Sequence, residues 1–288
     1  MDNLRPIGLM VTAMVFFTLG DMAIKLASAT ISPAQILIII GLFGGAMFSV
    51  MTRMQGHRVW TRDILRPELL WRNLAEIGGT ACMVTALSKV DLSLTAAILQ
   101  ATPLAVTLGA ALILREPVGW RRWSATILGF VGVLIIVRPG SSSFEPALLW
   151  PLAAMVLLAM RDLSTRLVPC DIPTLRVATY GMTSLVPAGL ILLALGQKMG
   201  AMDLIVTGYS ALAVLVGVAG YWAITAAMRS GEVSVVAPFR YSRIVFALVV
   251  GAVVFGERPD SWTLIGATVT VLAGLYIFVR EGRVKRAR

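Results

Sequence analysis

The chain repeats its own pattern once along its length. The Ala-Met-Val sequence at 13–15 recurs at 154–156, 141 positions later, and Asp21 matches Asp162 at the same spacing. At the same spacing of 141, Lys25 matches the basic Arg166, Ser93 matches Ser234 and Glu116 matches Glu257. One inserted residue then moves the spacing to 142, at which Trp120 matches Trp262 and Gly132 matches Gly274. A repeat this long in a strongly apolar chain is typical of membrane transporters built from two halves around a central site.

Composition predicts that the chain lies in a membrane. It is 58% hydrophobic and 14% charged, with a mean hydropathy of +0.85. A spanning helix needs about 20 apolar residues, and the stretches that qualify are 6–28, 33–52, 69–88, 93–114, 122–138, 147–167, 173–195, 206–228, 234–256 and 262–280. The alternation of a β-barrel is absent from the sequence, so we expect an all-α membrane protein with ten transmembrane helices. The first stretch has a repeat partner deep in the chain, which favours a span over a cleaved signal peptide.

Basic residues gather in alternate connections between these spans. The connections 53–68 and 115–122 hold four and three arginines, whereas the opposite connections hold little beyond Lys89, Lys198 and Arg258. The positive-inside rule then places both termini and the basic tail 283–288 in the cytoplasm. Five spans per repeat is an odd number, so the second repeat must be inverted relative to the first, and the charge of paired loops reverses as this requires.

Ionisable side chains fall inside several predicted spans, where each costs about 2.5–3.5 kcal/mol on insertion scales. We therefore expect them to face a cavity or a partner. At about 1.5 Å per residue, Glu76, Asp162, Arg240 and Arg243 fall at similar depths near the cytoplasmic side. One interpretation is an inner gate in which Glu76 and Asp162 pair with Arg240, Arg243 or Arg161. The other is a permanent ion-pair network that holds the bundle together.

Two further pairs of charges have spacings that matter. Asp21 and Lys25 fall at the mirror depth on the outer side, four residues apart, so they are able to pair on one helix face. Arg240 and Arg243 are three residues apart and share a face, and guanidinium groups bind carboxylates bidentately. The arginine pair favours an amino acid or another organic anion as the substrate.

Uncharged polar and aromatic residues are candidates for lining the cavity, because small-molecule sites combine aromatic walls with a few polar groups. These candidates are Asn73, Gln100, Tyr221, Trp222 and Tyr241. For Tyr221 and Trp222, a lipid-facing position is an equal alternative. Pro103 and Pro238 lie within or near spans, where proline kinks a helix and exposes backbone to a cavity. Gly41 and Gly45 form a small-residue motif that permits close helix packing.

Motifs of enzymes and ATP-driven pumps are absent from the sequence. The chain has one histidine, His57, and no zinc-protease, Walker A or nucleophile-elbow pattern. We therefore predict no catalytic residue, no metal site and no cofactor. The expected partners are a small-molecule substrate and the lipid bilayer, with no nucleic acid despite the net charge of +10. A monomer and a homodimer both remain open.

The later part of each repeat resembles a known family. Residues 86–140 and 227–282, the latter with the segments APFRYS and FGERPDSW, are similar to the EamA domain of the drug/metabolite transporter superfamily. The resemblance covers nearly the whole chain and predicts two such domains, at 6–140 and 147–282. It implies ten helices arranged as two inverted five-helix repeats around a central cavity.

Members of that family move small metabolites, often outward, including amino acids. The resemblance therefore implies an inner-membrane exporter of amino acids or related metabolites that works by alternating access. The first span, with its Ala-Met sequence, Asp21 and Lys25, is also similar to uptake members of the superfamily. Uptake of a vitamin or nucleoside-like metabolite is the alternative, and a membrane-embedded enzyme or a non-transporting scaffold are remote ones.

Overall fold

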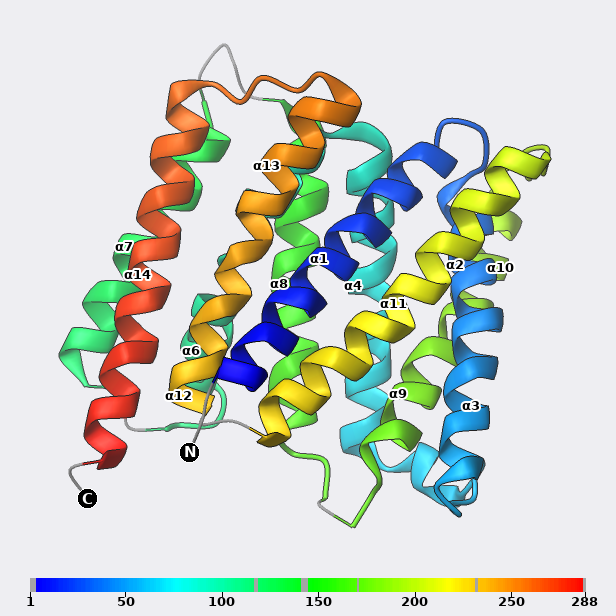
Figure 1. Ribbon diagram of the computed structural model, residues 1–288, viewed down its shortest axis with the longest axis horizontal. Coiled ribbons are helices and arrows are strands. Elements are labelled where there is room, and N and C mark those ends of the chain that lie inside the picture. Colours follow the sequence, from blue (N-terminus) through cyan, green and yellow to red (C-terminus); the bar gives the residue numbers. More distant parts are fainter. Residues whose placement is uncertain (1–3, 117–118, 141–144, 170, 231–232, 287–288) are drawn as a thin grey trace. The chain divides into compact units, whose positions relative to one another are not determined.

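A computed structural model describes residues 4–116, 119–140, 145–169, 171–230 and 233–286, in which helices are present and strands are not (Figure 1). The α-helices are α1 (Leu4–Ala27), α2 (Pro33–Ile39), α3 (Gly45–Met54), α4 (Pro67–Lys89), α5 (Leu92–Leu99), α6 (Thr102–Leu112), α7 (Trp120–Val137), α8 (Leu149–Thr165), α9 (Thr174–Thr183), α10 (Leu185–Ala194), α11 (Leu204–Ser230), α12 (Val233–Val236), α13 (Ser242–Phe255) and α14 (Ser261–Arg286). A π-helical segment, η1 (Ile40–Gly44), and three 3-10 segments, η2 (Arg62–Leu65), η3 (Pro146–Leu148) and η4 (Ala237–Tyr241), lie between them. The predicted all-α class is confirmed. Residues 287 and 288 of the predicted basic tail lie outside the described residues.

Eight helical stretches of the described chain are long and apolar enough to cross a membrane. They are Leu4–Ala27, Pro33–Met54, Leu92–Leu112, Trp120–Val137, Pro146–Thr165, Thr174–Ala194, Leu204–Met228 and Ala237–Phe255. The other two predicted spans fall short for different reasons. α4 has 23 residues but carries four charges, and the apolar part of α14, Ser261–Ile277, is shorter than the rest. The chain is thus a multi-pass membrane protein with eight clear candidate spans where the sequence predicts ten.

The helices divide into two compact units, and each unit draws on both halves of the sequence repeat. Unit 1 contains Met1–Leu19, Val90–Leu152 and Ala219–Arg288, and unit 2 contains Gly20–Lys89 and Ala153–Val218. Within the units, spans that occupy the same place in the two repeats pack against each other. In unit 1 these are α7 with α14 and α5 with α13, and in unit 2 they are α2 with α10 and α3 with α9.

In unit 1, α7 and α14 approach each other closely through glycines. A Cβ atom at Gly132 would lie 2.5 Å from the Thr270 hydroxyl oxygen and 2.7 Å from the Gly266 carbonyl oxygen. The same Thr270 hydroxyl donates a hydrogen bond to the Gly129 carbonyl oxygen at 3.2 Å. Larger residues at these positions would separate the helices, so this contact depends on the absence of side chains.

The turns after α6 and α13 show that the sequence repeat is also a repeat of structure. The Glu116 amide donates to the Ala110 carbonyl oxygen at 3.1 Å, and the Glu257 amide donates to the Gly251 carbonyl oxygen at 2.9 Å. Both ends of the second bond lie 141 positions after those of the first. The residue before each glutamate is left-handed, Arg115 with φ 54° and Gly256 with φ 66°, as in helix ends closed by a left-handed residue.

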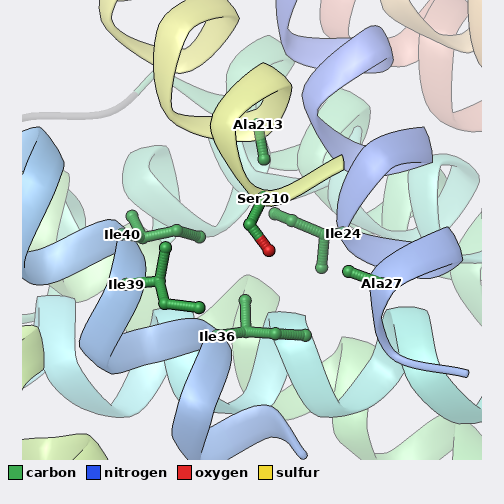
Figure 2. A pocket seen from close by; sticks show the side chains of 7 residues that line it. All are labelled: Ile24, Ala27, Ile36, Ile39, Ile40, Ser210 and Ala213. Atoms are coloured by element: carbon green, nitrogen blue, oxygen red, sulfur yellow. The ribbon is translucent and has the colours of Figure 1, made fainter. Parts of the chain in front are cut away.

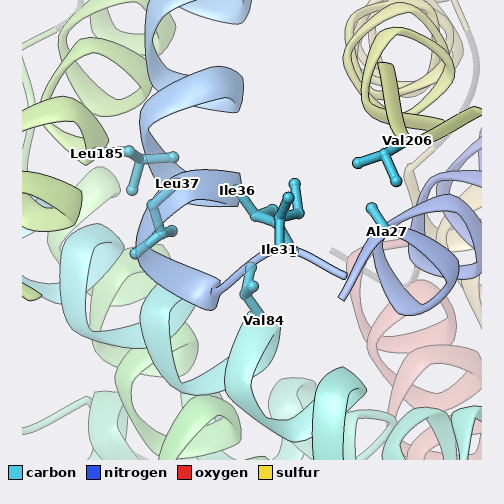
Figure 3. Packing of buried hydrophobic residues seen from close by; sticks show 7 residues of the cluster. All are labelled: Ala27, Ile31, Ile36, Leu37, Val84, Leu185 and Val206. Atoms are coloured by element: carbon cyan, nitrogen blue, oxygen red, sulfur yellow. The ribbon is translucent and has the colours of Figure 1, made fainter. Parts of the chain in front are cut away.

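In unit 2, the span formed by α2, η1 and α3 packs against α9 and α10 through small residues. A Cβ atom at Gly41 would lie 2.9 Å from the Val186 backbone nitrogen, and one at Gly45 would lie 2.8 Å from the Thr183 hydroxyl oxygen. The close packing predicted for Gly41 and Gly45 is therefore confirmed. An apolar cluster lies beside this contact (Figure 3) and consists of Ala27, Ile31, Ile36, Leu37, Val84, Leu185 and Val206.

Replacing Gly132 with alanine should destabilise the protein by about 1–3 kcal/mol, because the added methyl group would overlap backbone that has no room to move. The matched control is Gly208→Ala on α11, where a Cβ atom would meet nothing within 4 Å. That change should stabilise the helix by about 0.5–1 kcal/mol. Thermal unfolding in detergent measures both, and shifts of the same sign would contradict the glycine contact.

Candidate functional site

Four spans are interrupted, at corresponding places in the two repeats. The span Pro33–Met54 becomes π-helical over Ile40–Gly44, and its repeat mate is broken at Ser184, between α9 and α10. The span Leu92–Leu112 is broken between α5 and α6, and its repeat mate contains the 3-10 segment Ala237–Tyr241. Interrupted helices at matching positions of two repeats are the usual pointer to the binding site of a secondary transporter, and π-helical turns are frequent at functional sites.

A hydrogen bond joins two of these interruptions inside unit 1. Gln100 Nε2 donates to the Tyr241 backbone carbonyl oxygen at 3.0 Å, and the two residues are 141 positions apart, so they are repeat mates. Both side chains are buried, with Gln100 9% and Tyr241 5% exposed. Pro103 lies in the first turn of α6, just after the break, and Pro238 lies in the first turn of the 3-10 segment itself. Proline is tolerated in such first turns because its missing N–H is not needed there. The amide of Gln100 thus supplies a donor to backbone at an interrupted helix.

The Tyr241 ring occupies space that a glycine on α14 leaves open. A Cβ atom at Gly274 would overlap the phenol group of Tyr241. Tyr241 is therefore held between its own interrupted span and α14, within unit 1. Two residues predicted to line a cavity, Gln100 and Tyr241, are brought together by this arrangement.

A cluster of charged side chains lies inside unit 2, on α4 and α8. Glu76 Oε2 accepts a hydrogen bond from Arg72 Nη2 at 2.8 Å, and Glu76 Oε1 accepts one from Arg161 Nη1 at 3.1 Å. Arg161 also donates to its neighbour Asp162 at 2.8 Å through Nη2. The Thr80 hydroxyl donates to Glu76 Oε1 at 3.3 Å. The two arginines and two carboxylates balance in charge. Burial of any one of them without its partners would leave an uncompensated charge inside the unit, which is strongly destabilising.

The cluster has a closed side and an open side. On the closed side Arg72, Asn73 and Glu76 are buried, and Arg72 Nη1 donates to Asn73 Oδ1 at 3.1 Å. A Cβ atom at Gly181 of α9 would overlap the Arg72 guanidinium group, so that glycine makes room for it. On the open side, the side chains of Arg161 and Asp162 are 27% and 31% exposed.

The structure places Glu76 against Arg161, a pairing that both the gate and the permanent-network interpretations allow. The other candidates divide between the units, with Tyr221, Trp222, Arg240 and Arg243 in unit 1 and Asp21 and Lys25 in unit 2. The Arg243 guanidinium carbon lies 5.7 Å from the centroid of the Phe17 ring, within the range of a cation–π interaction. Trp222 is 57% exposed, as a lipid-facing side chain would be. Pairing of Glu76 or Asp162 with Arg240 or Arg243 stays a prediction.

Sequence reasoning aligned Glu257 with Glu116 but gave it no function, and the structure shows what it does. The buried Glu257 carboxylate accepts hydrogen bonds from the Leu92 amide at 2.6 Å, the Ser93 amide at 2.9 Å and the Ser93 hydroxyl at 2.6 Å. It therefore caps the N-terminus of α5, where a carboxylate also meets the positive end of the helix dipole. The joint recurrence of serine and glutamate in the repeat was the signal that could have revealed this cap.

A small cavity in unit 2 is lined by Ile24, Ala27, Ile36, Ile39, Ile40, Ser210 and Ala213 (Figure 2). Its volume is about 10 Å³, which is enough for about one water molecule, whereas metabolite sites measure about 300–1,000 Å³. The Ser210 hydroxyl points into it and forms no hydrogen bond with the part of the chain that the structure describes. In this conformation the cavity is too small for a metabolite. Among the described residues, no group of His, Cys, Asp and Glu is arranged to bind a metal ion.

One charged group outside the spans anchors the connection between α3 and α4. Asp63 accepts a hydrogen bond from Arg176 Nη1 at 2.9 Å and from the Thr61 hydroxyl at 2.7 Å. The Thr61 hydroxyl lowers the pKa of the Asp63 carboxyl, burial opposes this, and Arg66 and Arg176 lower it further, so that the net shift is downward. The carboxylate is therefore charged at neutral pH.

Comparison with known proteins gives one family and several distant relatives. The family model described as the EamA-like transporter family matches residues 4–138 and again 145–280. A solved crystal structure is similar to the chain with a TM-score of 0.66 over 96% of this chain and 98% of the other, at 17% identity. That likeness shows a shared fold.

Three curated proteins illustrate the range of relatives. A riboflavin transporter of Vibrio cholerae is 26% identical over 251 residues, which is 85% of this chain and 74% of that protein. An S-adenosylmethionine uptake transporter of Rickettsia prowazekii is 27% identical over 187 residues, 63% of this chain and 61% of that protein. The pseudopaline exporter CntI of Pseudomonas aeruginosa is 26% identical over 282 residues, 94% of this chain and 95% of that protein.

Changing Arg161 to glutamine should destabilise the protein by about 2 kcal/mol, less than the 3–5 kcal/mol of a fully buried pair because Arg161 is partly exposed. The double variant Arg161→Gln/Glu76→Gln should lose less than the sum of the two single changes, because each single change leaves a charge without its partner. The control is Arg166→Gln, an exposed residue just after the end of α8, and it should change stability by less than about 0.5 kcal/mol. Thermal unfolding measures all four proteins. Additive losses would refute an energetic link between Arg161 and Glu76.

The anchor at Asp63 should depend on pH. Because the pKa of Asp63 is lowered in the fold, its stabilising effect is present above the unfolded pKa of about 3.9 and disappears as pH falls through the folded value. Asp63→Asn should therefore increase hydrogen exchange of residues 53–66 at pH 7, and the difference from the unchanged protein should shrink progressively as the pH falls below about 4. A difference that persists at low pH would mean that Asp63 acts without its charge.

Proposed function

We infer that the chain, which belongs to the EamA-like transporter family and is a membrane transporter of small molecules, takes up a vitamin or nucleoside-like metabolite across the inner membrane. The observation that carries the transport mechanism is the interruption of repeat-related spans, joined in unit 1 by the bond from Gln100 to Tyr241. The substrate class is supported by similarity to transporters named for riboflavin, a vitamin, and for S-adenosylmethionine, which contains a nucleoside.

The proposed architecture has ten spans in two inverted five-helix repeats, at 6–140 and 147–282, around a central cavity, with both termini in the cytoplasm. The charges of α4 do not prevent it from crossing the membrane, because Glu76 is paired with Arg72 and Arg161. The helix α14 continues beyond its apolar part to Arg286, which gives it 26 residues in all. Its length of about 39 Å exceeds the hydrocarbon thickness of about 30 Å.

Alternating access requires that the interrupted spans change their local geometry while their outer turns stay packed. The 3-10 segment Ala237–Tyr241 and the π-helical segment Ile40–Gly44 are suited to this. Their backbone hydrogen bonds span three and five residues, and a shift to the α-helical spacing of four changes the local geometry with little loss of hydrogen bonding. Arg240 lies within the 3-10 segment Ala237–Tyr241, and Arg243 lies in the first turn of α13 that follows it. There they would bind a carboxylate or phosphate of the substrate. We propose Tyr221 and Tyr241, which belong to the same unit as the two arginines, as neighbours of that anion site.

Export of an amino acid or a related metabolite is the second candidate. It is favoured by similarity to the exporter CntI over nearly the full length of both chains. The paired arginines also suit the carboxylate of an amino acid. Both candidates use the same residues and differ in the substrate's ring system and in direction.

Flux through purified protein separates the two candidates. Proteoliposomes should be prepared with radiolabelled riboflavin, S-adenosylmethionine or an amino acid mixture, either inside or outside, with and without a pH gradient. We expect protein-dependent movement of one of the first two and none of the amino acids. Movement of amino acids alone would replace uptake with the export candidate. No movement of any solute, from protein shown to be folded, would reject both.

Arg243→Gln should reduce this flux at least about tenfold, as expected when one charge-assisted contact to an anion is lost. The control is Arg258→Gln, an exposed arginine in the connection between α13 and α14, which should leave the flux unchanged. Protein abundance and thermal stability are measured in parallel. Normal flux from well-folded Arg243→Gln protein would remove this residue from the substrate site.

A further inference from the structure

The connection between α3 and α4 carries positive charge that its own acid does not balance. Residues 53–66 contain four arginines and one aspartate. Asp63 is already shared between Arg66, at 3.4 Å, and Arg176 of α9, at 2.9 Å. The other three, Arg53, Arg58 and Arg62, are exposed, and their side chains form no ion pair with the described residues. Three guanidinium groups within ten residues are therefore available to an outside anion.

Large apolar side chains are exposed between these arginines. Met54 is 81% exposed, Trp60 56% and Leu65 69%. A surface that faces only water gains nothing by exposing such groups next to charges. Arginine mixed with tryptophan and aliphatic side chains is the pattern of segments that lie in the headgroup region of a bilayer.

The connection is also held in a fixed conformation. The Trp60 ring stacks on Tyr180 of α9 with 5.8 Å between the ring centroids. The Tyr180 hydroxyl accepts a hydrogen bond from the Thr61 amide at 3.2 Å, and Arg176 Nε donates to the Arg58 carbonyl oxygen at 2.9 Å. The arginines on this segment are thus presented by a folded loop, which lowers the entropy lost when a ligand orders them.

We propose that residues 53–65 form a binding surface for the headgroups of anionic phospholipids. The segment links the end of the candidate span Pro33–Met54 to α4 (Figure 1), and because α4 is also proposed above to cross the membrane, the segment would lie at the membrane surface. Arg53, Arg58 and Arg62 bind lipid phosphates through their planar guanidinium groups, for which phosphate is a well-matched partner. Trp60 and the exposed aliphatic side chains enter the boundary between headgroups and acyl chains. This surface is independent of the identity of the transported solute.

Quenching of Trp60 fluorescence by brominated lipids tests the proposal directly. The full-length protein is placed in nanodiscs of phosphatidylcholine that contain a 10% fraction of brominated phosphatidylglycerol or, in a parallel sample, of brominated phosphatidylcholine. The chain has seven tryptophans, so the Trp60 signal is obtained as the difference from the Trp60→Phe protein. We expect stronger quenching of Trp60 by the anionic lipid than by the zwitterionic lipid at the same fraction, and a weaker preference at 0.5 M salt.

Charge variants decide whether the three arginines cause this preference. In Arg53→Gln/Arg58→Gln/Arg62→Gln protein, the preference for anionic lipid at Trp60 should fall about tenfold, since each arginine near the surface contributes to it. The control, Lys89→Gln/Lys198→Gln/Arg258→Gln, removes the same total charge from exposed positions in other connections. It should keep the preference. Circular dichroism and thermal unfolding establish that both variants are folded.

Four results would overturn the proposal. The first is equal quenching by both lipids in the unchanged protein. The second is a preference that survives loss of the three arginines. The third is a preference lost equally in the control variant, which would assign it to net charge. A soluble polyglutamate peptide is added in a final arm, and displacement of anionic lipid at equimolar peptide would assign the surface to an acidic protein partner instead.

Discussion

Close approach of repeat-related helices is the constraint on which the rest of this structure depends. Helices in lipid gain little from apolar contact with each other, so their association relies on shape and on polar groups that meet at short range. Here Gly132 and Gly266 let α7 meet α14, and Gly41 lets the interrupted second span meet α10. Only at such separations is a side-chain hydroxyl, as in Thr270, able to reach a carbonyl on the neighbouring helix.

Charge inside the membrane follows the same logic of local compensation. Glu76 does not stand alone on α4, because Arg72 one turn earlier and Arg161 on α8 both donate to it. The set is neutral, so it avoids most of the cost of an isolated charge, yet removal of any one member leaves the others uncompensated. The side chains of Arg161 and Asp162 remain partly exposed, so the cluster is balanced in charge without being fully closed.

The sequence predicted more of the architecture than of the sites, for physical reasons. Membrane helices are predictable because an apolar run of about 20 residues has few alternatives in lipid, and the small-residue motif of Gly41 and Gly45 predicted close helix packing. The span at 69–88 was predicted from its apolar run, but α4 is not among the clear candidate spans of the structure, since its hydropathy is diluted by Glu68, Arg72, Glu76 and Lys89. The contacts of Glu257 were missed, because a carboxylate that caps a helix 164 residues away leaves no local pattern.

The bond between Gln100 and Tyr241 has a particular consequence for how this fold is able to move. The Tyr241 carbonyl lies where the 3-10 segment ends and α13 begins, in the N-cap position that accepts the first backbone bond of a helix. Gln100 adds a second donor to it from the repeat-related span, so a change in the geometry of either span breaks this bond unless another donor takes its place. A polar substrate or water is such a donor. The interruption is therefore a place where binding of a polar solute and rearrangement of the helices are coupled through the hydrogen bond from Gln100 to Tyr241.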